Sequence, residues 1–200
     1  MLVFYYILLG VFSMDNMMAN GMDAYDRVMS KVLNVSKVKQ GQIEDMMNKV
    51  AYHESAGTMD PAIKQHGGGP GRGMFQYELS SGKGSGAGRT AMNRLYAVLG
   101  GDLINGVKPD NMPKWIEPYF KKDDSGNLMP HGDVDFSKLT DKQQKTLFLA
   151  DKLKTKGAIP SLGTVSESDW WAEYHHKGAN SNKVKFSDDV VRYLSEKASK

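Results

Sequence analysis

The chain has 200 residues, of which 40% are hydrophobic and 24% are charged, and it carries a formal net charge of +3. This composition is typical of one globular domain with a sizeable core, and it excludes a disordered or membrane-embedded chain. The absence of cysteine excludes thiol catalysis, disulfide bonds and Cys-based zinc sites, while so small a positive charge does not predict a nucleic-acid-binding protein.

The first 21 residues differ in character from the rest of the chain. Residues 2–12 are almost continuously apolar, but a membrane span needs roughly 20 such residues. No Lys or Arg precedes this run, and residues 13–21 offer only a poor cleavage site for a signal peptidase. The sequence therefore predicts an N-terminal extension at residues 1–21, which docks on a partner, lies at a membrane interface or acts as a signal, and one domain at residues 22–200.

Two amphipathic helices are predicted at the start of this domain, over residues 24–35 and 42–54. Apolar side chains recur there at helical spacing. The stripe of the first helix consists of Tyr25, Val28, Met29 and Val32, and that of the second of Ile43, Met46, Met47, Val50 and Ala51. The polar residues 36–41 are expected to connect the two helices.

Helical periodicity disappears between residues 57 and 88, where glycines accumulate together with Pro61 and Pro70. This pattern predicts loops and a small hairpin. An irregular connection of such length is uncommon in a compact domain unless it has a function, such as lining a binding site. We therefore expect this glycine-rich segment, residues 57–88, to border the functional site.

Four further helices are predicted from capping and stop signals. The first covers residues 90–99 and ends at Gly100-Gly101, after which a loop rich in Asn, Pro and Asp is expected. The N-terminal signals of the others are Thr140 with Gln143, Ser166 with Asp169, and Ser187 with Asp188 and Asp189. Gly157 is predicted to close the helix that follows Thr140, and the last helix is predicted to run through Leu194. The sequence thus predicts an α+β fold that is predominantly helical, with about six helices around one irregular segment.

Glu54 is the residue whose position most strongly suggests chemistry. The apolar stripe of residues 43–51 continues at helical spacing onto Glu54, so a carboxylate ends a buried helix face. A carboxyl group in apolar surroundings is either paired or kept protonated by a raised pKa, as a glycosidic general acid requires. The negative end of the helix dipole raises the pKa further. The alternative is a structural Glu54 that faces solvent or pairs with Arg72 or Arg89.

The residues that follow Glu54 form a series known from one group of enzymes. Glu54-Ser55 precedes Pro61-Ala62-Ile63 and then Gly71-Arg72-Gly73-Met74-Phe75-Gln76. This order resembles the lytic transglycosylases and goose-type lysozymes, in which a helix-ending Glu-Ser is followed by a glycine turn and Gly-Leu-Met-Gln. The resemblance covers residues 42–99 well and the remainder weakly, and the separation of Glu54 from Gln76 is longer than is usual in the family. Chains with Gly-Pro-Gly-Arg-Gly and Phe-Gln look most like phage particle-associated wall-degrading enzymes.

The resemblance implies a lysozyme-like domain in which Glu54 is catalytic and Ser55 belongs to the substrate-binding residues. Gly73 lets the backbone approach a ligand, and the Gln76 amide suits sugar hydroxyls and N-acetyl groups. Tyr77 is expected to present its ring to the cleft. Phe75, by contrast, is expected in the core.

A third signature of the family is a Tyr-Asn pair whose Tyr hydroxyl reaches the catalytic carboxylate. Its nearest match is Tyr174-His175, where His replaces Asn and leaves the role of Tyr174 open. We include both residues among the substrate-binding candidates, while Trp170 or Trp171 is expected either to stack on a sugar or to lie in the core. His175 and His176 point away from each other on a helix, so they predict surface or cleft-edge positions and not a metal site.

The resemblance further implies cleavage of the β-1,4 glycosidic bond between N-acetylmuramic acid (MurNAc) and N-acetylglucosamine (GlcNAc) in bacterial peptidoglycan. Lytic transglycosylases use one Glu as acid and base, and the muramic C6 hydroxyl attacks the anomeric carbon. Hydrolysis needs a second carboxylate, for which Asp60 and Glu78 are the candidates, although solvent-facing loop positions explain both more simply. We expect a transglycosylase that needs no cofactor and no metal.

Other functions stay open at this point. Plant-type chitinases also combine His-Glu, here His53-Glu54, with Gly-Arg-Gly-x-x-Gln, and a catalytically inactive virion structural or wall-binding protein is the non-enzymatic alternative. The expected partner is the peptidoglycan glycan strand, with other virion proteins or a membrane contacted through residues 2–12 and no nucleic acid. The expected location is a phage virion, as a tail or internal protein that acts in the host periplasm, or else the bacterial periplasm or cell envelope.

Overall fold

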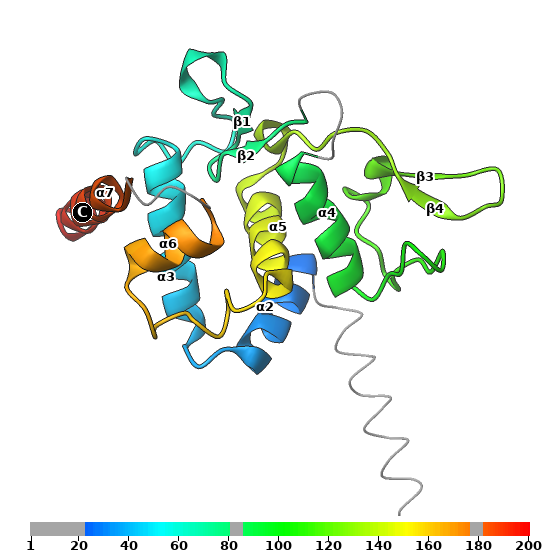
Figure 1. Cartoon of the computed structure of the whole chain (residues 1–200), viewed down its shortest axis with the longest axis horizontal. Helices are drawn as coiled ribbons and strands as arrows, with labels where there is room; N and C mark the ends of the chain where they lie inside the picture. Colours follow the sequence, from blue (N-terminus) through cyan, green and yellow to red (C-terminus); the bar gives the residue numbers. More distant parts are fainter. Residues whose placement is uncertain (1–22, 81–85, 177–181) are drawn as a thin grey trace, which may run out of the picture.

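The computed structural model of the chain describes residues 23–80, 86–176 and 182–200. The predicted extension at residues 1–21 lies outside these ranges. The described residues form six α-helices and two small antiparallel sheets, so the prediction of a predominantly helical α+β fold is confirmed at that level (Figure 1). Among them, no helix is both long and apolar enough to cross a membrane.

The first two helices lie where the apolar spacing predicts them. α2 spans Ala24–Val35 and α3 spans Gln40–Glu54. The Asp23 side chain accepts a hydrogen bond from the Asp26 N–H and so satisfies one free donor in the first turn of α2. α3 starts two residues earlier than predicted because the Gln42 side chain accepts a hydrogen bond from the N–H of Lys39, the residue before the helix, and caps the helix there.

α5 (Asp141–Lys154) is the central helix of the fold, and it packs against both α2 and α4 (Ala87–Val98) (Figure 1). Its N-terminus carries the predicted capping box, in which Thr140 and Gln143 exchange hydrogen bonds. Every residue from 146 to 152 is buried, so this stretch of the helix has no solvent-facing side. A helix that is enclosed all round is one that other elements must pack around.

The glycine-rich segment contains the small hairpin that the sequence predicts. β1 (Gly71–Arg72) pairs antiparallel with β2 (Tyr77–Glu78). In the turn between them, Gly73 has a φ of +72°, and a Cβ atom at this position would lie 2.3 Å from Oε1 of Gln144. The turn therefore needs glycine both for its backbone conformation and for its close contact with α5.

Gln144 anchors this turn to the central helix. Its side chain is fully buried, and Oε1 accepts a hydrogen bond from the Met74 N–H at 2.9 Å. Nε2 lies 2.7, 2.8 and 3.0 Å from the carbonyl oxygens of Pro61, Phe136 and Leu139, which share its two N–H donors. One amide thus satisfies backbone groups from several separate segments that have no partner in a helix or sheet.

A second hairpin occupies part of the region that was expected to be a loop. β3 (Phe120–Lys122) pairs antiparallel with β4 (Leu128–Pro130). The Asp123 side chain sets the turn, because it accepts hydrogen bonds from the N–H groups of Ser125 and Asn127. The two strands are short and only one of their side chains is buried, so the sequence shows no alternation that predicts them.

α6 (Glu167–Tyr174) and α7 (Lys183–Ala198) complete the fold and pack against each other. The Ser166 hydroxyl accepts a hydrogen bond from the Asp169 N–H, which confirms the predicted start of α6. The predicted start of α7 is wrong, because Ser187 lies inside the helix and donates to the carbonyl of Lys183. α7 also extends beyond the predicted end at Leu194.

Two other boundaries differ from prediction. α4 begins at Ala87 and not at Thr90, because its first turn buries Arg89, whose guanidinium donates to backbone carbonyls of residues 119, 131 and 132. α4 does end ahead of Gly100, as predicted, where a φ of +101° breaks the helix. Gly157 lies three residues beyond the end of α5 and belongs to a separate turn, so it does not close that helix.

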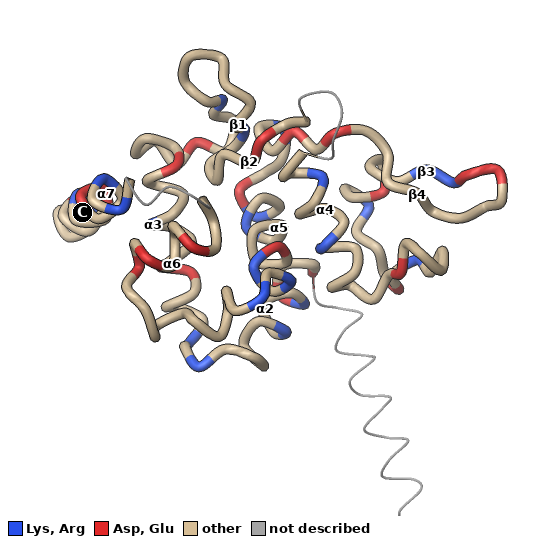
Figure 2. The backbone as a smooth tube through the Cα atoms, in the orientation of Figure 1, with Lys and Arg blue, Asp and Glu red and all other residues tan. Residues whose placement is uncertain are grey.

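Charged residues of both signs are interspersed along the helices and loops (Figure 2). This distribution accords with the small formal net charge of +3. The lysines of β3 lie beside the acidic residues of the turn that follows, and α5 carries both signs (Figure 2). Electrostatic effects in this fold are therefore local and act between neighbouring charges.

Replacing Gln144 with Leu should destabilise the fold by about 3 kcal/mol or more, because buried backbone groups lose their partners. The neighbouring Gln143→Leu is the matched control, since it loses only a cap interaction and should cost about 1 kcal/mol. The free energy of unfolding in urea, followed by circular dichroism, measures both. Equal losses in the two variants would contradict the anchoring role of Gln144.

Candidate active site

The C-terminal end of α3 borders a cleft of about 1100 Å³. Its walls come from the end of α3, the glycine-rich segment, α4, α5, the end of α6 and the beginning of α7. The polar and aromatic side chains that line it include Glu54, Gln76, Glu78, Arg94, Lys152, Trp171, His175, His176 and Lys185. The glycine-rich segment therefore borders a cleft, as the sequence predicts.

Glu54 is the last residue of α3, and its side chain is only 11% exposed. The indole N–H of Trp171 donates a hydrogen bond to Oε1 of Glu54 at 2.8 Å. Nε2 of His175 lies 3.4 Å from the same oxygen. Arg72 and Arg89 instead donate to backbone carbonyls. The alternative of a Glu54 that faces solvent or pairs with either arginine is therefore wrong.

Burial raises the pKa of the Glu54 carboxyl group from its ordinary value of 4.5 to about 7. The Trp171 N–H and the charges of Lys152 and Lys185 act in the opposite direction, but they do not outweigh burial. The carboxyl group thus keeps its proton up to near-neutral pH. Its ionised form still has one donor and two nearby cations, so the group can give up a proton and take one back.

His175 follows α6 directly, and its side chain is 7% exposed. Burial, together with the charge of Lys152, holds the pKa of His175 well below its usual value, so the ring is neutral. Nε2 lies 3.2 Å from the Phe75 carbonyl oxygen as well as close to Glu54, and we assign the ring proton to this nitrogen because a carbonyl can only accept. Nδ1 is then a buried acceptor with no partner among the described residues.

Gln76 ends the turn of the β1–β2 hairpin with a left-handed φ of +49°. Its Nε2 donates to the Gly73 carbonyl at 2.8 Å, while Oε1 is buried without a partner among the described residues. A Cβ atom on Gly71 would lie 2.5 Å from that oxygen, so glycine leaves room for the amide. A strained backbone and an unpaired acceptor are costs to the fold, and their place in the cleft wall suggests a binding role.

Ser55 and Tyr77 support the cleft with side chains that are already engaged. Ser55 is fully buried, and its hydroxyl accepts a hydrogen bond from the Met59 N–H at 2.8 Å, which holds the turn after α3. Tyr77 is also buried, with its ring stacked on Phe136 and its hydroxyl donating to Asp151 at 2.8 Å. Tyr77 therefore borders the cleft as part of the core and not, as expected, with a free ring.

Trp171, and not Tyr174, contacts the Glu54 carboxyl group. The Tyr174 hydroxyl bonds to Ser161 at 2.9 Å, whereas the Trp171 N–H reaches Glu54. Both tryptophans are buried, and the Trp170 N–H donates to a backbone carbonyl, so they belong to the core as one alternative expected. The four-residue spacing of Trp171 and His175 places them on one helix face, and this signal could have identified the pair.

A buried ionic cluster in the cleft wall was missed from the sequence. Lys152 donates to Asp151 at 2.8 Å and to the Tyr174 carbonyl at 2.9 Å, and Asp151 also accepts from Arg94. Burial lowers the pKa of Lys152, although Asp151 opposes the shift. Burial by itself would raise the pKa of Asp151, but Lys152 and Tyr77 hold it below its usual range. Asp151 is thus ionised and paired, so it is not a general acid.

The two candidates for a second carboxylate, Asp60 and Glu78, are both exposed. Asp60 accepts a hydrogen bond from the Ala62 N–H and stabilises a turn, while Glu78 lines the cleft. Glu78 is therefore better placed than Asp60 to act as a second carboxylate in the cleft.

Within residues 23–80, 86–176 and 182–200, no cluster of three or more His, Asp and Glu side chains is placed to hold a metal ion.

Comparisons of the chain with models of known families, with curated proteins and with solved structures find no match. The features that bear on function are therefore those of the cleft and its side chains. The geometry that bears on it is an enclosed carboxyl group with a raised pKa, one indole donor and a neutral histidine.

The raised pKa of Glu54 predicts a stability difference from Glu54→Gln that changes with pH. A proton held more tightly in the folded than in the unfolded chain stabilises the fold fully below the ordinary pKa of 4.5, and this contribution is lost as the pH rises through about 7. We expect the unfolding free energy of the wild type to fall, relative to the variant, by about 3 kcal/mol from acidic to mildly alkaline pH. Urea denaturation across that range measures it, and a constant difference would contradict the raised pKa.

Proposed function

We propose that this protein cleaves the β-1,4 glycosidic bond between MurNAc and GlcNAc in bacterial peptidoglycan, on a lysozyme-like domain with Glu54 as the general acid. The observation that carries the proposal is a carboxyl group with a pKa of about 7 that ends a helix at the wall of a large cleft. The cleft volume of about 1100 Å³ suits a polymer segment better than a small metabolite. A protonated carboxyl group at neutral pH is what protonation of a glycosidic oxygen requires.

The chemistry can proceed on Glu54 alone. Its proton passes to the glycosidic oxygen, the bond from that oxygen to the anomeric carbon breaks, and GlcNAc leaves with a free C4 hydroxyl. The new carboxylate, stabilised by the Trp171 N–H, then takes the proton of the hydroxyl that attacks the anomeric carbon. In a transglycosylase this hydroxyl is the muramic C6 hydroxyl, so the product is a 1,6-anhydro end and Glu54 is protonated again.

Polar groups of the cleft suit an acidic, N-acetylated glycan. Gln76 lines the cleft, and its amide oxygen, buried without a partner among the described residues, has the capacity to accept from an N-acetyl N–H or a hydroxyl. Lys64 and Lys185 are exposed at the cleft and suit the carboxylates of lactyl groups and stem peptides. Chitin lacks these carboxylates, so the two lysines favour peptidoglycan over the chitinase alternative.

Hydrolysis is the second candidate, and the position of Glu78 favours it. Glu78 is exposed and lines the same cleft as Glu54, so it could activate a water molecule. The transglycosylase remains the primary proposal because it needs no group beyond Glu54. A virion protein that only binds the wall has no need of a carboxyl group with a raised pKa.

The proposed function implies a partner and a location for the protein. The partner is the glycan strand, and the protein acts as a phage virion component in the host periplasm, or in the bacterial periplasm or envelope. Residues 2–12, for which contacts with virion proteins or a membrane are expected, lie outside the described part of the chain.

Glu54→Gln should lower the rate of peptidoglycan cleavage by about 10²–10⁴-fold, because the amide keeps the shape of the side chain but has no proton to donate. Zymography and mass analysis of fragments released from purified peptidoglycan measure the loss and identify the new ends. Asp60→Asn is the matched control, since Asp60 is exposed and stabilises a turn. Cleavage by Glu54→Gln within about tenfold of the wild-type rate would reject Glu54 as the acid.

Glu78→Gln distinguishes the two candidate reactions. A transglycosylase should keep most of its activity in this variant and release 1,6-anhydro ends. Reducing ends in the wild type, together with a loss in Glu78→Gln as large as that in Glu54→Gln, would instead identify a hydrolase that uses two carboxylates.

A further inference from the structure

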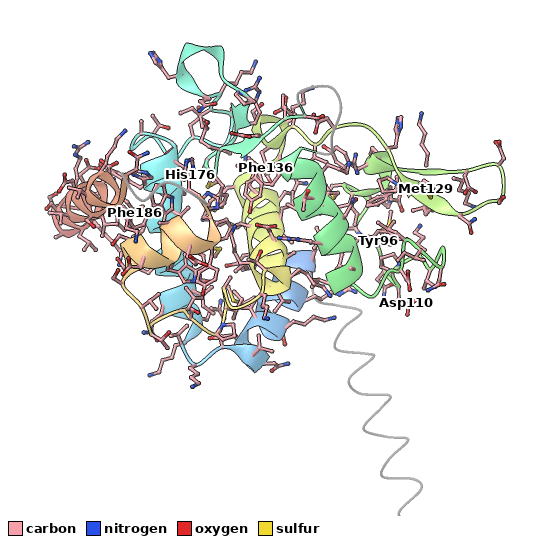
Figure 3. The ribbon with its side chains drawn as sticks, in the orientation of Figure 1. Tyr96, Asp110, Met129, Phe136, His176 and Phe186 are labelled. Carbon is pink, nitrogen blue, oxygen red and sulfur yellow. The ribbon has the colours of Figure 1, made fainter. Side chains whose placement is uncertain are left out.

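The indole ring of Trp171 is enclosed by side chains from three parts of the chain. It stacks on Phe186 of α7, with ring centroids 5.2 Å apart and an interplanar angle of 18°. The indole also stacks on His176, with ring centroids 5.3 Å apart and an interplanar angle of 11°. The His53 ring contacts the indole edge-on, with ring centroids 4.7 Å apart. Figure 3 labels His176 and Phe186 on the side of the molecule where α6 and α7 lie. Such packing fixes both the position and the tilt of the indole.

His53 is itself held by α7. Its Nδ1 lies 2.8 Å from Oδ2 of Asp189, and the two side chains are 8% and 11% exposed. A carboxylate can only accept, so Nδ1 carries a proton and the ring orientation is fixed relative to α7. The His53 ring also contacts Phe186, with centroids 5.2 Å apart. α7 thus supports Trp171 directly through Phe186 and indirectly through Asp189 and His53.

We propose that Asp189, His53 and Phe186 are positioning residues for the candidate acid, because together they hold the Trp171 N–H on Oε1 of Glu54. The contacts run from Asp189 to His53, from His53 to the indole, and from the indole N–H to the carboxyl oxygen at 2.8 Å. This inference rests on the proposed function of the same cleft. It assigns a role to α7, which supplies no reacting group.

The proposed role follows from the charge that Glu54 acquires during the reaction. A hydrogen bond to an ionised acceptor is roughly twice as strong as one to a neutral acceptor, so the indole favours the carboxylate over the protonated acid. Hydrogen bonds weaken steeply when their angle is lost, so a small tilt of the indole would remove much of this preference. α7, which also contributes Lys185 to the cleft wall, thereby sets how readily Glu54 releases its proton.

Other charged and titratable groups also face Glu54. Lys152 of α5 and Lys185 of α7 lower its pKa, His175 lies 3.4 Å away, and Tyr77 of β2 is close enough for the Glu54 charge to affect its pKa. All four stay unchanged in the variants described below. A shift in the Glu54 pKa therefore reports on the indole and its supports.

The test measures the Glu54 pKa directly in the full chain, by NMR titration of protein labelled with ¹³C at the Glu carboxyl carbons. Trp171→Phe keeps an aromatic ring but loses the N–H, so we expect the Glu54 pKa to rise by about one unit. Glu54 must be protonated to act as an acid. The pH at which the rate of peptidoglycan cleavage falls on the alkaline side should therefore increase together with the Glu54 pKa. Trp170→Phe is the matched control, since it loses an indole hydrogen bond to the Ala158 carbonyl and should shift neither value.

Asp189 is tested by two substitutions that separate charge from positioning. Both Asp189→Ala and Asp189→Asn remove a negative charge, which by itself lowers the pKa of a nearby carboxyl group. Only the Asn side chain still accepts a hydrogen bond from His53 Nδ1. We therefore expect a higher Glu54 pKa in Asp189→Ala than in Asp189→Asn. Tyr52→Phe removes another contact between α3 and α7, the 2.7 Å hydrogen bond to Glu196, and should leave the Glu54 pKa unchanged.

Equal Glu54 pKa values in Asp189→Ala and Asp189→Asn would overturn the inference, as would a shift in Trp170→Phe as large as that in Trp171→Phe. Phe186→Leu, which keeps an apolar side chain without the stacked ring, replaces Asp189→Ala if circular dichroism shows that the latter does not fold. In that case an unshifted Glu54 pKa in Phe186→Leu overturns the inference. The titration needs no substrate, so this failure is distinct from retained cleavage by Glu54→Gln, which would overturn the proposed function.

Discussion

A carboxyl group withdrawn from water at the end of a helix must stay protonated or find a donor, and the structure around Glu54 provides for both states. Burial raises its pKa to about 7, while the Trp171 N–H keeps the ionised form within reach. The nearby His175 is neutral and Lys152 is paired with Asp151, so neither side chain forms a full ion pair with Glu54. The glycine-rich segment and the last two helices enclose this group.

The bodies of the helices could be predicted because their signals are local. The bounds of α2 agree fully with the apolar spacing, and the caps at Thr140 and Ser166 depend on residues only three positions away. The start of α7 could not be predicted in this way. Ser187 has suitable capping chemistry, but a helix from Lys183 buries Phe186 completely, and burial of an aromatic ring outweighs one cap.

The residues of the candidate site also divide into those that local sequence signals predict and those that depend on contacts between distant parts of the chain. Glu54 could be found because it continues an apolar stripe on its own helix. The contact with its donor joins residues 117 positions apart, so only the four-residue spacing of Trp171 and His175 on one helix face points to that donor. Tyr174 was considered for this role, but consecutive residues of a helix point in different directions, so the Tyr174 hydroxyl reaches Ser161 while its neighbour His175 lies beside Glu54.

The distance along the sequence between Glu54 and the helices α6 and α7 also determines when, during biosynthesis, the Glu54 carboxyl group acquires its raised pKa. α3 leaves the ribosome well before α6 and α7, because synthesis proceeds from the N-terminus. Until those two helices dock, the carboxyl group at the end of α3 faces water, has the ordinary acidity of a glutamate and is ionised at neutral pH. For a protein with the proposed activity, the general acid is therefore assembled only after nearly all of the chain has been synthesised and folded.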